Sequence, residues 1–225
     1  MKLNHIKPLH LLGLVCLICV GILIYYGKQK IGYHIDEIYS YGLANSYSHP
    51  FPNDINQWLS GQYYQDYIST EWGHRFNFGA VYNNQVQDVH PPIYYILLHT
   101  IASIFPGVFN KWIGLSLNLI THLASLIVMI QIGKQISKNK YLPYLIGICW
   151  AVSLGGLNTF LFIRMYSLVT LWGLCLLWLS LLILEANELL LRKLLTLFMI
   201  ILLGSLTHYY FIIYAFLLWP SYLVS

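Results

Sequence analysis

Two adjacent carboxylates, Asp36 and Glu37, come shortly after the first apolar run of the chain. Neighbouring side chains on a helix point in different directions, so the two acids need not act as a pair. One carboxylate could accept a proton from a reacting hydroxyl while the other holds a metal ion, a sugar hydroxyl or a backbone amide. A solvated loop charge is the alternative interpretation. The segment 34–47 predicts a short helix with Asp36 and Ser40 away from its apolar side.

A solitary arginine, Arg164, is the only charged residue between Tyr141 and Leu184. Placing a guanidinium near hydrocarbon costs several kcal/mol unless an anion or a carbonyl group meets it. Two interpretations stay open: an interfacial anchor whose side chain extends to the lipid headgroups, and an anion-binding side chain. A guanidinium is suited to bidentate contact with a phosphate group.

Four histidines lie among the acids of the same polar stretch, but none shows a short metal-ligand spacing such as HxH or HExxH. These histidines are His34, His49, His74 and His90. The sequence therefore predicts no metal ligands and no definite cofactor, and it leaves open whether a divalent cation binds.

The composition excludes an ordinary soluble domain, because 58% of the 225 residues are apolar and 9% are charged, with a mean hydropathy of +0.62. Six of the eight acids fall between residues 27 and 90. These are Asp36, Glu37, Asp54, Asp66, Glu71 and Asp88. Lys and Arg are scattered at the ends of apolar runs, so they form no basic stripe for nucleic acid. We expect an all-α, polytopic membrane protein with one large polar loop.

Five apolar runs are long enough to cross a bilayer, which takes about 20 helical residues. They are 9–26, 112–132, 141–163, 165–184 and 194–219. We expect residues 1–26 to form an uncleaved signal-anchor helix with its amino end in the cytoplasm, and residues 27–90 to form an extracytoplasmic loop containing the candidate acids. Residues 91–107 predict an interfacial helix, and residues 108–225 predict about four spans.

The segment 91–105 decides the topology of everything after it. If it does not cross, seven Lys and Arg lie inside and five outside; if it crosses, four lie inside and eight outside, against the positive-inside bias. We therefore expect a non-crossing helix and a multi-pass protein of the cell membrane. This topology brings the polar loop, Arg164 and His208 to the same outer face, with His208 about 14 residues, or roughly 21 Å, along the last run.

Four short motifs, in order along the chain, resemble the GT-C glycosyltransferases. The motifs are DEIYSYGLANS at 36–46, DVHPPIYYILLH at 88–99, IRMYSL at 163–168 and THYYF at 207–211. The likeness is closest to the bacterial relatives of protein O-mannosyltransferases and aminoarabinose transferases. The resemblance implies a GT-C-like helical fold and an enzyme that moves a sugar from a polyprenyl-phosphate carrier to an envelope acceptor at the outer face of the membrane.

The resemblance also implies roles for individual residues. The family holds an acidic residue just after its first helix, which matches Asp36 of the Asp36–Glu37 pair, and these two are the candidate catalytic residues. Charge builds up on the phosphate as the anomeric bond breaks, and Arg164 fits that end of the reaction. The candidate substrate-binding residues are Asp88, His90, Tyr94, Arg164, Tyr166 and His208. The expected partners are a polyprenyl-phosphate-linked sugar and membrane lipid, with no nucleic acid.

The chain departs from the family in two respects. It has fewer apolar runs than family members, so the resemblance implies an amino-terminal portion that a second polytopic subunit could complete. Aminoarabinose transferases have a lysine before the paired prolines, where this chain has His90. The alternative function is a non-catalytic membrane subunit, or an inactive fragment, of an envelope glycan assembly system. A transporter or channel is less favoured, because the spans lack internal repeats and paired charges.

Overall fold

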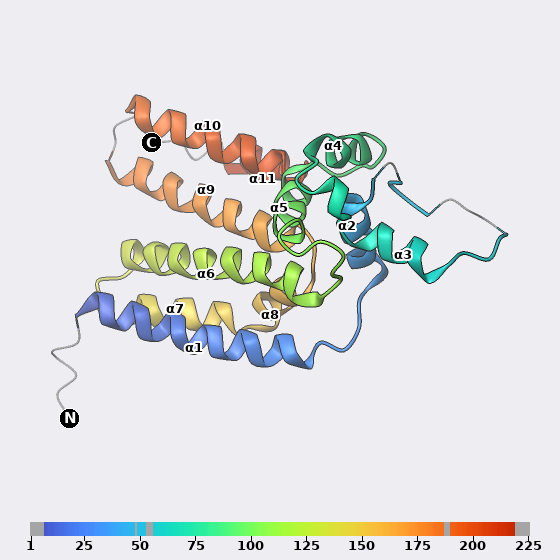
Figure 1. Ribbon diagram of the computed structural model, residues 1–225. Coiled ribbons are helices and arrows are strands. Elements are labelled where there is room, and N and C mark those ends of the chain that lie inside the picture. Colours follow the sequence, from blue (N-terminus) through green and yellow to red (C-terminus); the bar gives the residue numbers. More distant parts are fainter. Residues whose placement is uncertain (1–6, 48, 53–55, 187–189, 219–225) are drawn as a thin grey trace.

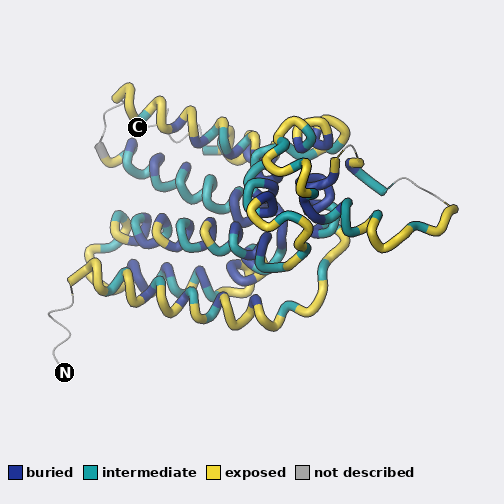
Figure 2. Tube along the Cα trace, in the orientation of Figure 1, coloured by how far each residue is buried: buried dark blue, intermediate teal, exposed yellow. Residues whose placement is uncertain are grey.

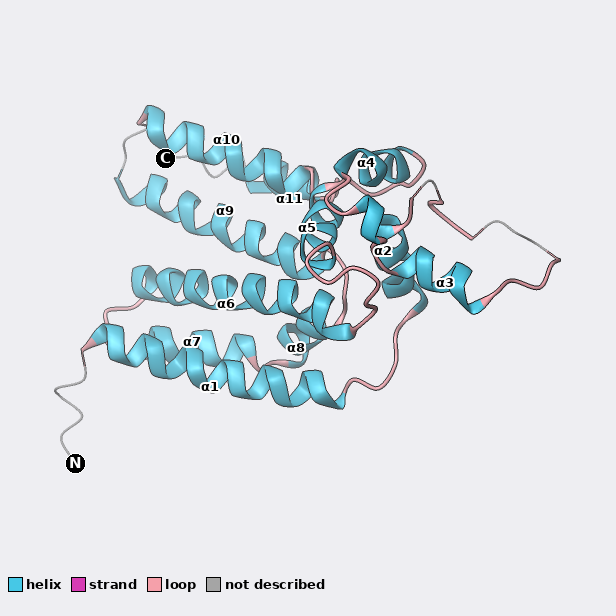
Figure 3. Cartoon of the chain, viewed as in Figure 1, coloured by secondary structure: helices cyan, strands magenta, loops and turns pink. Residues whose placement is uncertain are grey.

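The computed structural model describes residues 7–47, 49–52, 56–186 and 190–218, and every regular element in these ranges is helical (Figure 3). The all-α prediction is confirmed for this part of the chain; Asp54 lies outside it. Within these ranges, three helices are long and apolar enough to cross a membrane. They are α1 (Pro8–Gln29), α6 (Lys111–Ile136) and α9 (Tyr166–Ala186). Such helices are those of a multi-pass membrane protein.

The three long helices lie side by side in a bundle (Figure 1). α6 is in the middle and packs against both α1 and α9. The most apolar window of α6 is 61% buried within the protein, against 17% for that of α1. α1 therefore leaves most of its apolar surface for lipid, whereas α6 forms the core of the bundle.

A bend of 54° divides the run that we predicted as one span at 141–163. α7 (Leu142–Ala151) ends before the bend and α8 (Leu154–Leu161) follows it. The Oγ of Ser153 caps α8 by accepting a hydrogen bond from the backbone N–H of Gly156. A Cβ on Gly156 would lie 2.4 Å from the carbonyl oxygen of Trp150, so the tight bend requires glycine here. The pair forms either a broken span or a re-entrant segment.

The last predicted span, 194–219, is wrong as a single helix. α10 (Leu191–Ser205) and α11 (Phe211–Leu218) form a hairpin instead (Figure 1). The ring of Phe211 folds back against Gly204, where a Cβ would lie 2.4 Å from it. His208 therefore lies in the turn of the hairpin and not inside a helix, and its Nδ1 accepts a hydrogen bond from the N–H of Tyr210.

The other helices form a polar lobe at one end of the bundle, which we call the lobe end (Figure 1). They are α2 (Ile35–Asn45), α3 (Gly61–Ile68), the 3-10 helix η2 (Trp72–His74), α4 (Phe78–Val86) and α5 (Ile93–Ala102). α5 has 10 residues, about 15 Å of helix, which is too short to cross a bilayer alone. Its place in the membrane interface stays a prediction. Buried positions gather where the lobe meets the bundle (Figure 2).

Gly114, on α6, lies against Tyr41 of α2 and Ile163 of the turn before α9. A Cβ on this glycine would lie 2.2 Å from Ile163 Cγ2 and 2.9 Å from the Tyr41 hydroxyl. That hydroxyl donates to the carbonyl oxygen of Asn110 at 2.8 Å and accepts from the Gly114 N–H at 2.9 Å. Neither neighbour has room to move, because Tyr41 and Ile163 are both fully buried.

Gly114→Ala is expected to lower the free energy of unfolding by about 1–3 kcal/mol, the usual cost of forcing an extra methyl group into a packed core. Thermal unfolding of the purified chain in detergent measures the change. Gly32→Ala is the control, since no atom lies within 4 Å of a Cβ added there. A midpoint that falls no further for Gly114→Ala than for Gly32→Ala would contradict the close packing.

Candidate functional site

The amino end of α2 positions the two predicted catalytic acids. His34 is the N-cap residue: its Nδ1 accepts a hydrogen bond from the Asp36 N–H at 3.2 Å, and Glu37 Oε2 accepts one from the His34 N–H at 2.7 Å. This reciprocal arrangement is a capping box, which starts the helix at this sequence. The two acids lie apart, as predicted: the side chain of Asp36 is 41% exposed and that of Glu37 is fully buried.

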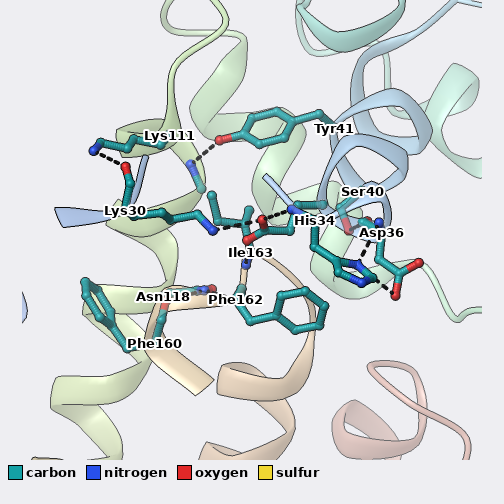
Figure 4. Close-up of polar contacts among 12 residues, drawn as sticks. Lys30, His34, Asp36, Ser40, Tyr41, Lys111, Asn118, Phe160, Phe162 and Ile163 are labelled. Atoms are coloured by element: carbon teal, nitrogen blue, oxygen red, sulfur yellow. Dashed lines mark hydrogen bonds and ion pairs between the residues drawn. The ribbon is translucent and has the colours of Figure 1, made fainter. Parts of the chain in front are cut away.

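Glu37 is a buried clamp. Its carboxylate accepts hydrogen bonds from Lys30 Nζ at 2.9 Å, from the His34 N–H at 2.7 Å and from the Ile163 N–H at 2.7 Å (Figure 4). Because Ile163 directly precedes Arg164, the clamp ties the turn before α9 to the start of α2. Of the roles left open for the second carboxylate, Glu37 has that of holding backbone amides. Both of its oxygens are occupied and it has no contact with solvent, so Asp36 is the acid available for chemistry.

Arg164 lies in the turn between α8 and α9, at the lobe end of the bundle. Its Nη1 donates to the Asp36 carbonyl oxygen at 3.0 Å and lies 3.8 Å from Asp36 Oδ1, while its Nη2 lies 3.2 Å from His90 Nε2. The side chain is 7% exposed, and its Nε has no hydrogen-bond partner among the described residues. The Asp36 carbonyl oxygen is the partner that a buried guanidinium requires. The Arg164 Nε–H is a further buried cationic donor, and such a donor favours an anion.

Asp88 and His90 support Arg164 from the lobe. A guanidinium can only donate, so His90 Nε2 accepts from Arg164 and His90 Nδ1 donates to Asp88 Oδ2 at 2.8 Å. Burial alone would raise the pKa of Asp88, but the hydrogen bonds from His90 and from the Val89 N–H outweigh it and bring the pKa below its ordinary value. Ionised Asp88 therefore holds His90 in the tautomer that accepts from Arg164.

His208 approaches the same cluster from the turn between α10 and α11. Its ring centroid lies 6.1 Å from that of His90 and 6.1 Å from that of Tyr166. The rings of Tyr209 and Tyr210 flank it at 5.2 and 5.1 Å. Burial lowers the pKa of His208, and the nearby His90 and Arg164 lower it further because they disfavour an additional positive charge. At neutral pH His208 is therefore an uncharged ring beside the arginine.

Acid is expected to destabilise the folded chain through His208. Its folded pKa lies below the unfolded value of about 6.5, so the unfolded chain binds the proton first as the pH falls. Stability is full above the unfolded pKa and is lost as the pH falls from there to the folded pKa. We expect His208→Gln to lose less thermal stability than wild type between about pH 7.5 and about pH 5.5. Equal losses in both proteins would contradict this, and His10→Gln, an exposed position on α1, is the control.

A pocket of about 430 Å³ opens beside the cluster. It is lined by Lys30, His34, Glu37, Asn158, Thr159, Leu161, Phe162 and Tyr166, so the acid at its wall is the buried Glu37. His34 joins the pocket to the exposed acid, since its Nδ1 lies 3.6 Å from Asp36 Oδ2. Tyr166 joins it to His208. The volume lies in the usual range for a small-molecule site, roughly 300–1,000 Å³.

Tyr94 is the predicted site residue that lies apart from this cluster. Its ring is fully buried, and its hydroxyl lies 3.5 Å from Asn118 Oδ1 in the core. A substrate contact for Tyr94 stays a prediction. Asp36, Asp88, His90, Arg164, Tyr166 and His208 are brought together, although their separate functional roles are not tested by this placement.

Two positioning residues were missed by the sequence analysis. Asn118 Nδ2 donates to the carbonyl oxygens of Phe160 and Phe162, both at 2.9 Å, and so shapes the turn that carries Arg164 (Figure 4). An amide inside an apolar span was the available signal for Asn118. Lys30, which pairs with Glu37, gave no such signal, because a lysine near the end of an apolar run is ordinarily a topology determinant.

The histidines of the polar stretch are dispersed. His34 caps α2, His90 contacts Arg164, and His74 stacks on Tyr47 with ring centroids 3.8 Å apart. Within the described ranges, no group of three His, Cys, Asp or Glu side chains is arranged to hold a metal ion.

Comparison of the chain with protein-family models, with curated proteins and with solved structures found no match. The resemblance to GT-C glycosyltransferases therefore stays a prediction, and the function has to be argued from the geometry of the cluster.

Proposed function

We propose that this chain is a glycosyltransferase, or the amino-terminal part of one, that takes a sugar from a polyprenyl-phosphate carrier. The observation that supports the proposal is the contact between Arg164 and Asp36. A cationic side chain with an unused buried donor lies next to a partly exposed carboxylate, so an anion site and a proton acceptor are adjacent. A lipid-borne sugar phosphate needs both groups, one for its phosphate and the other for the hydroxyl that attacks.

In the proposed reaction Asp36 takes the proton of the acceptor hydroxyl. The acceptor oxygen attacks the anomeric carbon as the bond from that carbon to the phosphate oxygen breaks, and the electron pair leaves on the phosphate. Attack from the face opposite the leaving group inverts the anomeric configuration. Arg164 stabilises the growing negative charge on the phosphate, with His90 and Asp88 holding its guanidinium in place.

The polar lobe lies at the outer face of the cell membrane and the amino terminus in the cytoplasm, which follows from the positive-inside bias. The polyprenyl tail lies along the apolar helices, and the acceptor is an envelope component. A second polytopic subunit is a proposed partner, because the carrier groove of the resembled enzymes requires more helices than the described ranges supply.

Phosphate binding tests the anion site. Arg164→Gln is expected to weaken the affinity of the purified chain for farnesyl phosphate roughly 10–100-fold, the effect of losing charge-assisted hydrogen bonds. Calorimetry in detergent measures it. Arg164→Lys should fall between the two, since it keeps the charge and loses the fork geometry. Arg192→Gln, at the other end of the bundle, is the control.

Equal affinity in Arg164→Gln and wild type would contradict the anion site. Binding that depends on Arg164 without any sugar transfer by the chain would favour the alternative, a non-catalytic subunit that holds the lipid carrier.

A further inference from the structure

Exposed apolar side chains occur on η2 and on the connection between α5 and α6. We call this surface the aromatic lip. It consists of Trp72, Arg75, Phe76, Ile104, Phe105 and Val108. The Arg75 guanidinium lies 5.7 Å from the ring of Trp72 and 5.5 Å from that of Phe76. The lip therefore combines large apolar groups with a cation held among them.

The two halves of the lip are joined through Ser103, at the end of α5. Arg75 Nε donates to the Ser103 carbonyl oxygen at 2.8 Å, and the Phe76 N–H donates to Ser103 Oγ at 2.9 Å. Phe76 has a φ of +54°, a left-handed conformation that is unfavourable for a bulky residue. The hydrogen bond to Ser103 holds Phe76 in this conformation with its side chain exposed. Such an arrangement is costly for a side chain that touches only water.

An apolar groove of about 340 Å³ begins at the lip and continues onto the first turns of α6. It is lined by Ile101, Phe105, Val108, Trp112, Ile113 and Ser116, together with Asn110. Ser116 and Ile120 are four residues apart and so lie on the same face of α6. Ile120 is 64% exposed on this helix, which is long and apolar enough to cross the membrane. The groove therefore opens on the lipid-facing side of α6, where that helix leaves the bilayer.

One acid, Glu71, borders the lip in the sequence, and its carboxylate lies 4.0 Å from His74 Nε2, whereas the charged residue of the lip itself is Arg75. The stretch 72–87 contains no acid, and neither does the stretch 89–184. Arg75 and Lys111 are the lysine or arginine residues of the sequence between 72 and 133. An apolar groove that ends at a basic rim complements a phospholipid, whose acyl chain is apolar and whose phosphate is anionic.

We propose that the aromatic lip lies in the headgroup layer of the membrane and binds an anionic phospholipid. The acyl chain occupies the groove beside Phe105 and Trp112, and the phosphate contacts Arg75. This site is separate from the Arg164 cluster and does not depend on the function proposed for that cluster. It fixes the height of the lobe above the bilayer through contacts that the spanning helices do not make.

The depth of the aromatic lip in the bilayer, measured by fluorescence quenching, tests the proposed membrane contact. Phe105→Cys, in a chain whose four native cysteines are replaced by alanine, is labelled with bimane in nanodiscs that contain doxyl-labelled phosphatidylcholine. We expect quenching at position 105 to be at least about threefold stronger than at Trp58→Cys. Trp58 is fully exposed in the loop before α3, which extends away from the bundle (Figure 1). Quenching at position 105 no stronger than at position 58 would overturn the proposal.

Comparing an anionic with a zwitterionic phospholipid tests the proposed contact between Arg75 and the lipid phosphate. Native mass spectrometry of the full chain compares its binding of phosphatidylglycerol with its binding of phosphatidylcholine. Arg75→Gln is expected to reduce the preference for phosphatidylglycerol about fivefold, the factor for one cation near an anionic surface. Arg75→Lys keeps the charge and should retain the preference. An unchanged preference in Arg75→Gln would overturn the assignment of the phosphate to Arg75.

Discussion

Asp36→Asn is expected to reduce sugar transfer about 10²–10⁴-fold, the usual contribution of a general base. The amide cannot take the proton of the acceptor hydroxyl. Affinity for the polyprenyl phosphate should hold or increase, because the substitution removes a negative charge that lies 3.8 Å from Arg164. Transfer from a radiolabelled polyprenyl-phosphate sugar, offered to membranes that contain the chain, measures the rate, and farnesyl phosphate titration measures the affinity.

The matched control is Asp66→Asn, the same substitution on α3 of the same lobe. The Asp66 carboxylate accepts a hydrogen bond from Gln62 on the same helix, so its replacement should leave transfer within about twofold. Undiminished transfer by Asp36→Asn would remove Asp36 from the proposed mechanism. A loss of phosphate binding together with transfer would instead show that Asp36 is needed to hold Arg164 in place.

Glu37→Ala is expected to lower the free energy of unfolding by about 3–5 kcal/mol, the cost of breaking a buried ion pair by removing one partner. The truncation removes a carboxylate that is 0% exposed, and it leaves the Lys30 ammonium, whose side chain is 15% exposed, and the Ile163 N–H without this partner. Thermal or denaturant unfolding of the purified chain measures the change. Glu37→Gln should lose less, because the amide oxygen can still accept one backbone hydrogen bond.

Glu71→Ala provides the control for this loss, because Glu71 is a half-exposed acid in the same lobe, 4.0 Å from His74. Removing a partly solvated pair of this kind should change stability by less than about 1 kcal/mol. If Glu37→Ala unfolds at the wild-type midpoint, Glu37 is not a clamp. The position of Asp36 would then need another explanation.

The long helices could be predicted from composition and run length. α1, α6 and α9 follow from uninterrupted apolar runs, because a chain in hydrocarbon must satisfy its backbone hydrogen bonds within the helix. Hydropathy could not show the breaks in the runs 141–163 and 194–219, which stay apolar across them. The breaks depend on close contacts between Gly156 and Trp150 and between Gly204 and Phe211, and these contacts form only once the chain has turned between the two residues.

Hydropathy and charge were enough to predict an all-helical membrane protein whose chemistry-bearing residues gather at one end. Alternating spans bring the polar loop and Arg164 to one end and place His208 toward the same face, although the turn that carries His208 was not predicted. The contacts of the two adjacent acids could be seen only in the folded chain. Glu37 bonds to Ile163, 126 positions along the chain, while Asp36 stays partly exposed beside Arg164, 128 positions away. Adjacent side chains diverge on a helix, and their partners come from elements that only folding brings within reach.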